Sequence, residues 1–134
     1  MPNNKFATVI TCMDGRIQLP VNEWIRKTFN VDYVDTITMP GPNKVMAKGY
    51  FGEMDSIRQK VRISVEAHGS KVLAIVGHYD CAGNPVTKEE IVKQIQANII
   101  RIKDWGLPLD LVGLWVNDRW EIETVAESKR RTAG

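Results

Sequence analysis

The chain has 134 residues, of which 43% are hydrophobic and 25% are charged, so it is long enough for one globular domain with one core. Its net charge is only +2, and acidic and basic residues are interspersed, which argues against a nucleic-acid-binding groove. Because no apolar run approaches the ~20 residues that span a bilayer, we expect one domain over residues 1–134 with neither a nucleic-acid nor a membrane partner.

The spacing of apolar residues and the turn residues predict the elements of the chain. Nearly continuous β-branched runs indicate buried parallel strands, apolar residues three or four apart indicate helices, and Thr87 with Glu90 forms a candidate capping box. Residues 39–43 have the composition of a turn, and residues 44–52 show no pattern. In chain order we predict strand 6–11, helix 20–30, strand 31–38, helix 54–69, strand 71–77, helix 87–106, and a strand with an edge strand or hairpin over 111–125.

Strands that alternate with helices in this way indicate an α/β fold, a mainly parallel β-sheet flanked by helices. In such sheets the ligand site lies beyond the carboxyl ends of the strands. Two polar stretches come directly after predicted strands: residues 12–16 (CMDGR) and residues 77–83 (GHYDCAG). We therefore expect these two stretches to lie together at one edge of the sheet.

Together the two stretches contain Cys12, His78 and Cys81, which are metal-ligand residue types. Zinc takes thiolate and imidazole readily, and a site with three protein ligands leaves the fourth position for water, as in zinc enzymes. The residue types therefore predict a Zn²⁺ site that exists only when the two strands lie side by side.

Other interpretations of these residues stay open. A cysteine after a buried strand is often only a small buried hydrophobe, and a histidine in a glycine-rich loop is often only a hydrogen-bonded loop residue. Cys12 is also a candidate nucleophile. A Cys12–Cys81 disulfide is disfavoured, because two cysteines and no apolar segment in residues 1–5 lead us to expect a cytoplasmic protein.

Asp14 and Arg16 lie two residues apart, so in an extended continuation of the strand they would point to the same side, near the metal. A carboxylate held by a guanidinium stays ionised and oriented, and it can accept a hydrogen bond from a metal-bound water. If Arg16 released it, Asp14 could instead become the fourth ligand and close the site.

The two stretches resemble motifs of the β-class carbonic anhydrases: residues 12–16 match Cys-x-Asp-x-Arg, and residues 77–81 match Gly-His-x-x-Cys. The resemblance covers most of the chain. It implies a zinc lyase that interconverts carbon dioxide and bicarbonate through a zinc-bound hydroxide, assembled as a homodimer or a higher homo-oligomer. By the same resemblance, Cys12, His78 and Cys81 are the zinc ligands, and Asp14 and Arg16 are the catalytic pair.

The chain also departs from that family. Residues 39–42 (MPGP) keep only the glycine of an Arg-Asn-Ala-Gly stretch, and Ala82 separates Cys81 from its glycine. The glutamine that precedes the first strand in the family is missing, with only Asn3 and Asn4 as nearby amides, and we expect no helical arm around a partner subunit. Alternative functions are therefore hydrolysis of carbonyl sulfide or carbon disulfide, and a non-catalytic zinc protein closed by Asp14. We expect the tryptophans in the core or at a subunit interface: Trp24, Trp105, Trp115 and Trp120.

Overall fold

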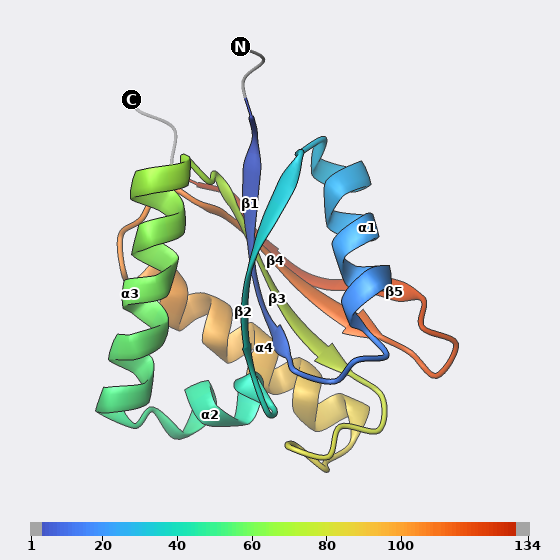
Figure 1. Ribbon diagram of the computed structural model, residues 1–134. Helices are drawn as coiled ribbons and strands as arrows, with labels where there is room; N and C mark the ends of the chain where they lie inside the picture. Colours follow the sequence, from blue (N-terminus) through green and yellow to red (C-terminus); the bar gives the residue numbers. More distant parts are fainter. Residues whose placement is uncertain (1–3, 131–134) are drawn as a thin grey trace.

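A computed structural model describes residues 4–130 of the chain (Figure 1). Within these residues, five strands form one sheet in the order β2-β1-β3-β4-β5, with β1 to β4 parallel and β5 antiparallel to β4. The mainly parallel α/β fold predicted from the sequence is therefore confirmed. The elements are β1 (Phe6–Cys12), α1 (Gln18–Phe29), β2 (Tyr33–Met39), α2 (Pro42–Lys48), α3 (Phe51–His68), β3 (Val72–His78), α4 (Lys88–Lys103), β4 (Asp110–Val116) and β5 (Ile122–Ser128).

Helices cover both faces of the sheet. Helix α1 lies on one face, and α2, α3 and α4 lie on the other (Figure 1). The alternation of side chains along a strand divides the core accordingly, so that Val9 packs in the α1 layer, whereas the adjacent Ile10 packs in the layer of α3 and α4. Strand β3 is buried along its whole length, as its continuous apolar sequence predicts. No helix among residues 4–130 is long and apolar enough to cross a membrane.

Several helix ends confirm the sequence signals. Asn30 ends α1 and Gly69 ends α3, both in the left-handed conformation with φ of 52° and 68°. At the start of α4, the Thr87 hydroxyl accepts a hydrogen bond of 3.2 Å from the backbone N–H of Glu90. These local signals set where each crossover helix returns the chain to the sheet.

Helix α2 is the main difference from the sequence prediction. Residues 39–43 were expected to form a turn and residues 44–52 no element, but Pro42–Lys48 is helical. Pro42 opens the helix, where its missing N–H leaves no hydrogen bond unmade, and Gly41 before it has φ of 52°. The helix has only 7 residues, too few for its buried face to give a periodic pattern.

Helix α4 packs closely on the sheet at Gly113 of β4. A Cβ at this position would clash with Ile95 of α4 and lie 3.1 Å from the Ala126 Cβ. We expect Gly113→Ala to lower the free energy of unfolding by about 1–3 kcal/mol. Gly52 in α3 is the matched control, because nothing lies within 4 Å of the place that a Cβ would take there, and Gly52→Ala should raise stability by up to about 1 kcal/mol. Urea unfolding measures both, and equal stability of the two variants would contradict the packing described.

Candidate metal centre

Parallel pairing of β1 and β3 brings the two polar stretches together. The strands are in register at Ile10 and Ile75, so their carboxyl ends lie at the same edge of the sheet. The segments that follow them leave the sheet at this shared end (Figure 1). Cys12 is the last residue of β1, His78 is the last residue of β3, and Cys81 lies three residues further on.

These three residues form one buried cluster. The ligand atoms of Cys12, His78 and Cys81 all lie within 4.8 Å of one another, and the three residues are 4%, 1% and 7% exposed. The two sulfurs are 3.8 Å apart and belong to free thiols. Burial, and then the nearby Cys12 sulfur, raise the pKa of the Cys81 thiol. The predicted ligands therefore meet, and together they can hold a metal ion, which would favour the thiolate forms.

The orientation of the imidazole supports this use. His78 Nδ1 is 2.8 Å from the backbone carbonyl oxygen of Tyr79. Because a carbonyl can only accept, Nδ1 carries the proton and Nε2 has the free lone pair. Among the described residues, the buried Nε2 has no hydrogen-bond partner. A buried acceptor without a partner is costly, and a carbonyl-oriented imidazole beside thiols is the usual arrangement of a metal ligand.

Two glycines let the loop before α2 pack against the loop that follows Cys81. Gly41 precedes α2, and Gly83 follows Cys81 by two residues. A Cβ on Gly83 would lie 2.7 Å from the backbone nitrogen of Gly41 and 2.7 Å from the Pro40 carbonyl carbon. The two backbones approach so closely that a side chain on either glycine would clash. This close packing explains why residue 41 is a glycine.

Asp14 and Arg16 form a bidentate ion pair two residues after the cluster residue Cys12. Arg16 Nη2 donates to Asp14 Oδ2 at 2.7 Å, and Arg16 Nε donates to Oδ1 at 3.1 Å. The side-chain hydrogen bond from Arg16 lowers the pKa of Asp14 to about 2, so this carboxylate is ionised at neutral pH. The same bond raises the pKa of Arg16 above its usual range.

The route by which the pair forms differs from the prediction. Strand β1 ends at Cys12, and residues 15–17 form a turn rather than an extended continuation of the strand. The Arg16 backbone N–H also donates to Asp14 Oδ1, at 2.9 Å, so the turn itself orients the carboxylate.

Arg16 also contacts two residues that the sequence patterns did not connect with it, Asp80 and Trp120. Its Nη1 is 3.3 Å from Asp80 Oδ2, and its Nη2 donates to the Asp80 carbonyl at 3.1 Å. Its guanidinium carbon lies 4.9 Å from the centre of the Trp120 ring. Trp120, which was expected in the core or at an interface, is packed at the edge of the α1-side core and contacts the catalytic-pair candidate directly.

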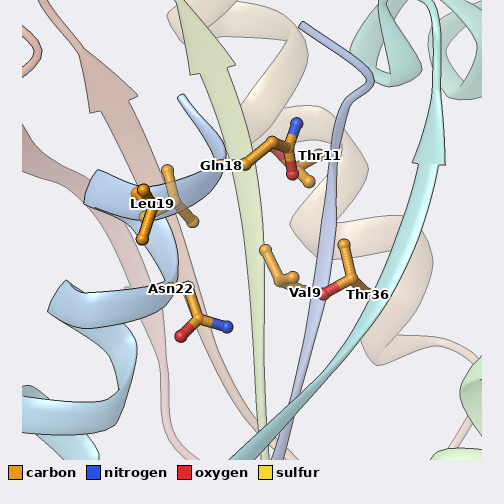
Figure 2. A pocket seen from close by; sticks show the side chains of 7 residues that line it. Val9, Thr11, Gln18, Leu19, Asn22 and Thr36 are labelled. Atoms are coloured by element: carbon orange, nitrogen blue, oxygen red, sulfur yellow. The ribbon is translucent and has the colours of Figure 1, made fainter. Parts of the chain in front are cut away.

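A pocket of about 420 Å³ lies between α1 and strands β1 and β2 (Figure 2), and none of the three clustered residues lines it. Both polar and apolar side chains line it, namely those of Gln18, the buried Thr11, Asn22, Thr36, Val9, Leu19 and Val21. The Gln18 amide donates to the carbonyls of Cys12 and Asp14 at 2.9 and 2.8 Å. Gln18 therefore stabilises the turn that contains the ion pair. This role could not be predicted from the sequence, because a glutamine at the start of a helix is common.

Of the two amides near the first strand, Asn4 does not line this site. Asn3 lies outside the described residues. Asn4 lines a different pocket with Phe6, Lys71 and Asp110, at the amino end of the strands. Strand β1 separates Asn4 from Cys12. The amide that binds the turn of the ion pair is that of Gln18.

Comparisons with known proteins agree with this arrangement. A family model described as "Putative carbonic anhydrase" matches residues 2–126. The fold is similar to that of a carbonic anhydrase from Glaciozyma antarctica, with 15% identity, a TM-score of 0.60, and coverage of 93% of this chain and 83% of that one. It is also similar to a structure described as tetrameric β-carbonic anhydrases from Sordaria macrospora, with 12% identity, a TM-score of 0.56, and coverage of 94% of this chain and 83% of that one.

No curated protein matches the chain. The identities to the solved structures are low, so those structures show the shared fold alone. The family model, in contrast, spans nearly all of the chain, including β1 with its CMDGR stretch and β3 with its GHYDC stretch. The chain therefore belongs to the carbonic anhydrase family that this model describes, and it has the β-class carbonic anhydrase fold.

Proposed function

We propose that this protein is a zinc-dependent carbonic anhydrase that interconverts carbon dioxide and bicarbonate. The observation that carries the proposal is the buried Cys12, His78 and Cys81 cluster, in which His78 Nε2 has no hydrogen-bond partner among residues 4–130. The ionised Asp14, held by Arg16, follows Cys12 by two residues. Family membership and the fold support the same reaction.

The donor set fits zinc. Two thiolates at the usual Zn–S distance of ~2.3 Å on one tetrahedral ion are separated by ~3.8 Å. The Cys12 and Cys81 sulfurs are 3.8 Å apart. Zinc held by two thiolates and one imidazole would supply Lewis acidity and would lower the pKa of a bound water to ~7.

The protein's own residues would orient the reactants. Both Asp14 oxygens are bound by Arg16, but an ionised carboxylate has about four lone-pair positions, so Asp14 can still accept a hydrogen bond from a water molecule in the site. Arg16 keeps Asp14 unprotonated and prevents it from rotating freely. Asp14 is not one of the three clustered ligand residues, which supports a site in which these three residues would hold the metal and the fourth position would be open to water.

We also propose a cytoplasmic homo-oligomer, at least a dimer. Within the described residues, β2 is an edge strand with no neighbour on its outer side, and Tyr33 on it is half exposed. Uncovered sheet edges are usually paired or shielded. The Sordaria macrospora proteins are described as tetrameric. Sedimentation of the full chain tests this proposal, and a monomer at micromolar concentration would contradict it.

The reaction is tested by comparing three substrates on one zinc-loaded preparation. We expect zinc-dependent hydration of carbon dioxide, with slower or no hydrolysis of carbonyl sulfide and carbon disulfide. The altered residues 39–42 motivate this comparison, because they lead into helix α2 and Gly41 packs against Gly83, two residues after Cys81. Faster hydrolysis of either sulfur compound would replace the proposed substrate. Full zinc occupancy without turnover of any of the three would identify a non-catalytic zinc protein.

A further inference from the structure

Arg16 connects three segments that are far apart in the sequence. It binds Asp14 within its own turn, and it contacts Asp80 in the loop after β3. The ring of Trp120, in the β4–β5 hairpin, lies on its guanidinium. The ring-to-cation distance of 4.9 Å is within the range of a cation–π contact. The guanidinium therefore contacts two acidic residues and one aromatic ring.

These contacts matter because the Arg16 side chain is 45% exposed. An exposed arginine–carboxylate pair gains little by itself, since both side chains lose rotamer freedom and water competes for their hydrogen bonds. The Asp80 carbonyl and the Trp120 ring add two contacts to the Arg16 conformation that the structure shows. That conformation is the one in which Arg16 binds both oxygens of Asp14.

The backbone at both supporting residues is unusual. Among the described residues, only three that are not glycine have positive φ, and two of them are Asp80 at 56° and Trp120 at 60°. Aspartate tolerates this conformation fairly well, whereas a bulky aromatic residue does so at a cost. The hairpin thus holds a strained tryptophan whose ring lies on Arg16, and such strain is concentrated at functional sites.

We propose that Trp120 and Asp80 are positioning residues that hold Arg16 against Asp14. The proposal rests on the proposed function in taking Asp14 and Arg16 as the catalytic pair. Neither Trp120 nor Asp80 is one of the clustered ligand residues, so they act through Arg16. Loss of the Trp120 ring should let Arg16 leave its place, so that the Asp14 carboxylate loses its fixed orientation while the metal ligands stay in place.

The test measures hydrogen exchange of the Arg16 Nε–H by NMR on the zinc-loaded full chain, without substrate. We expect Trp120→Leu to speed this exchange about three- to tenfold, with unchanged zinc content. Trp120→Phe, which keeps an aromatic face, should restore slow exchange. If the leucine variant does not fold, Trp120→Gly gives the same comparison, because glycine adopts positive φ without strain.

Trp24→Leu is the matched control. Trp24 is also a partly buried tryptophan of the α1-side core, but its aromatic contact is with Phe29 and it does not support Arg16. Unchanged exchange in Trp120→Leu, or equally fast exchange in Trp24→Leu, would overturn the proposal.

Asp80→Asn provides an independent variant. Asparagine tolerates positive φ and keeps the backbone carbonyl, so only the charge facing Arg16 is lost. We expect faster Arg16 exchange than in the wild type, but slower exchange than in Trp120→Leu. Exchange as slow as in the wild type would remove Asp80 from the proposal. Because no substrate is present, these results decide the positioning roles even if the wild-type protein hydrates no carbon dioxide.

Discussion

Replacing Cys81 with serine is expected to abolish zinc binding and carbon dioxide hydration together. Changes to residues that only support a metal ligand weaken binding by about 10- to 100-fold, so loss of a ligand should weaken zinc binding by more than ~100-fold. Serine keeps the size of the side chain but replaces a thiolate with a hydroxyl, which stays protonated at neutral pH. Cys12 and His78 would then be left as a two-ligand site.

Zinc content after dialysis and the hydration rate, both taken on one sample, measure this effect. Tyr79→Ala is the matched control in the same loop, because the Tyr79 side chain is 48% exposed and its backbone carbonyl, which accepts from His78, is kept. This control should retain its zinc. A Cys81→Ser protein that binds zinc as tightly as the wild type would show that Cys81 is not a ligand.

Replacing Asp14 with asparagine should lower the hydration rate about 10²- to 10³-fold while zinc content is unchanged. The substitution conserves shape but removes the charge that Arg16 binds at 2.7 Å. An amide can present its NH₂ group where the carboxylate accepted a hydrogen bond, so the water in the site would lose its orientation.

Stopped-flow hydration assays on Asp14→Asn and Asp104→Asn separate this role from a general effect of charge. Asp104 ends α4, outside the metal cluster, and its change should leave the rate as it is. Zinc loss in Asp14→Asn would show that Asp14 is a metal ligand, and an unchanged rate would show that it has no catalytic role.

The central strands and the meeting of Cys12, His78 and Cys81 could be predicted from the sequence because both follow from local patterns. The apolar runs that became β1 and β3 are buried, and parallel pairing brings their ends together. Cys12, His78 and Cys81 therefore meet without any long-range information beyond the strand order. Helix α2 was not predicted because it has only 7 residues, too few to show a helical spacing of apolar positions. Its buried face, which includes Asn43 and Met46, depends on tertiary packing.

The surroundings of Arg16 could not be predicted in the same way. Its pairing with Asp14 is local and was expected, although a turn rather than an extended strand produces it. Its contact with Trp120 depends on where the β4–β5 hairpin turns, and β5 carries a register shift opposite Gly113 and Leu114. No spacing in the sequence specifies that position, so the sequence predicted only that Trp120 is buried in the core or at an interface.

The most direct test of the proposed function is a titration of zinc into metal-free protein, with bound zinc and carbon dioxide hydration measured on the same samples. A carbonic anhydrase with this Cys12, His78 and Cys81 site should show a rate that rises in proportion to bound zinc and stops at about one ion per chain. Full occupancy at one ion per chain without any zinc-dependent rate, from neutral to alkaline pH, would contradict it.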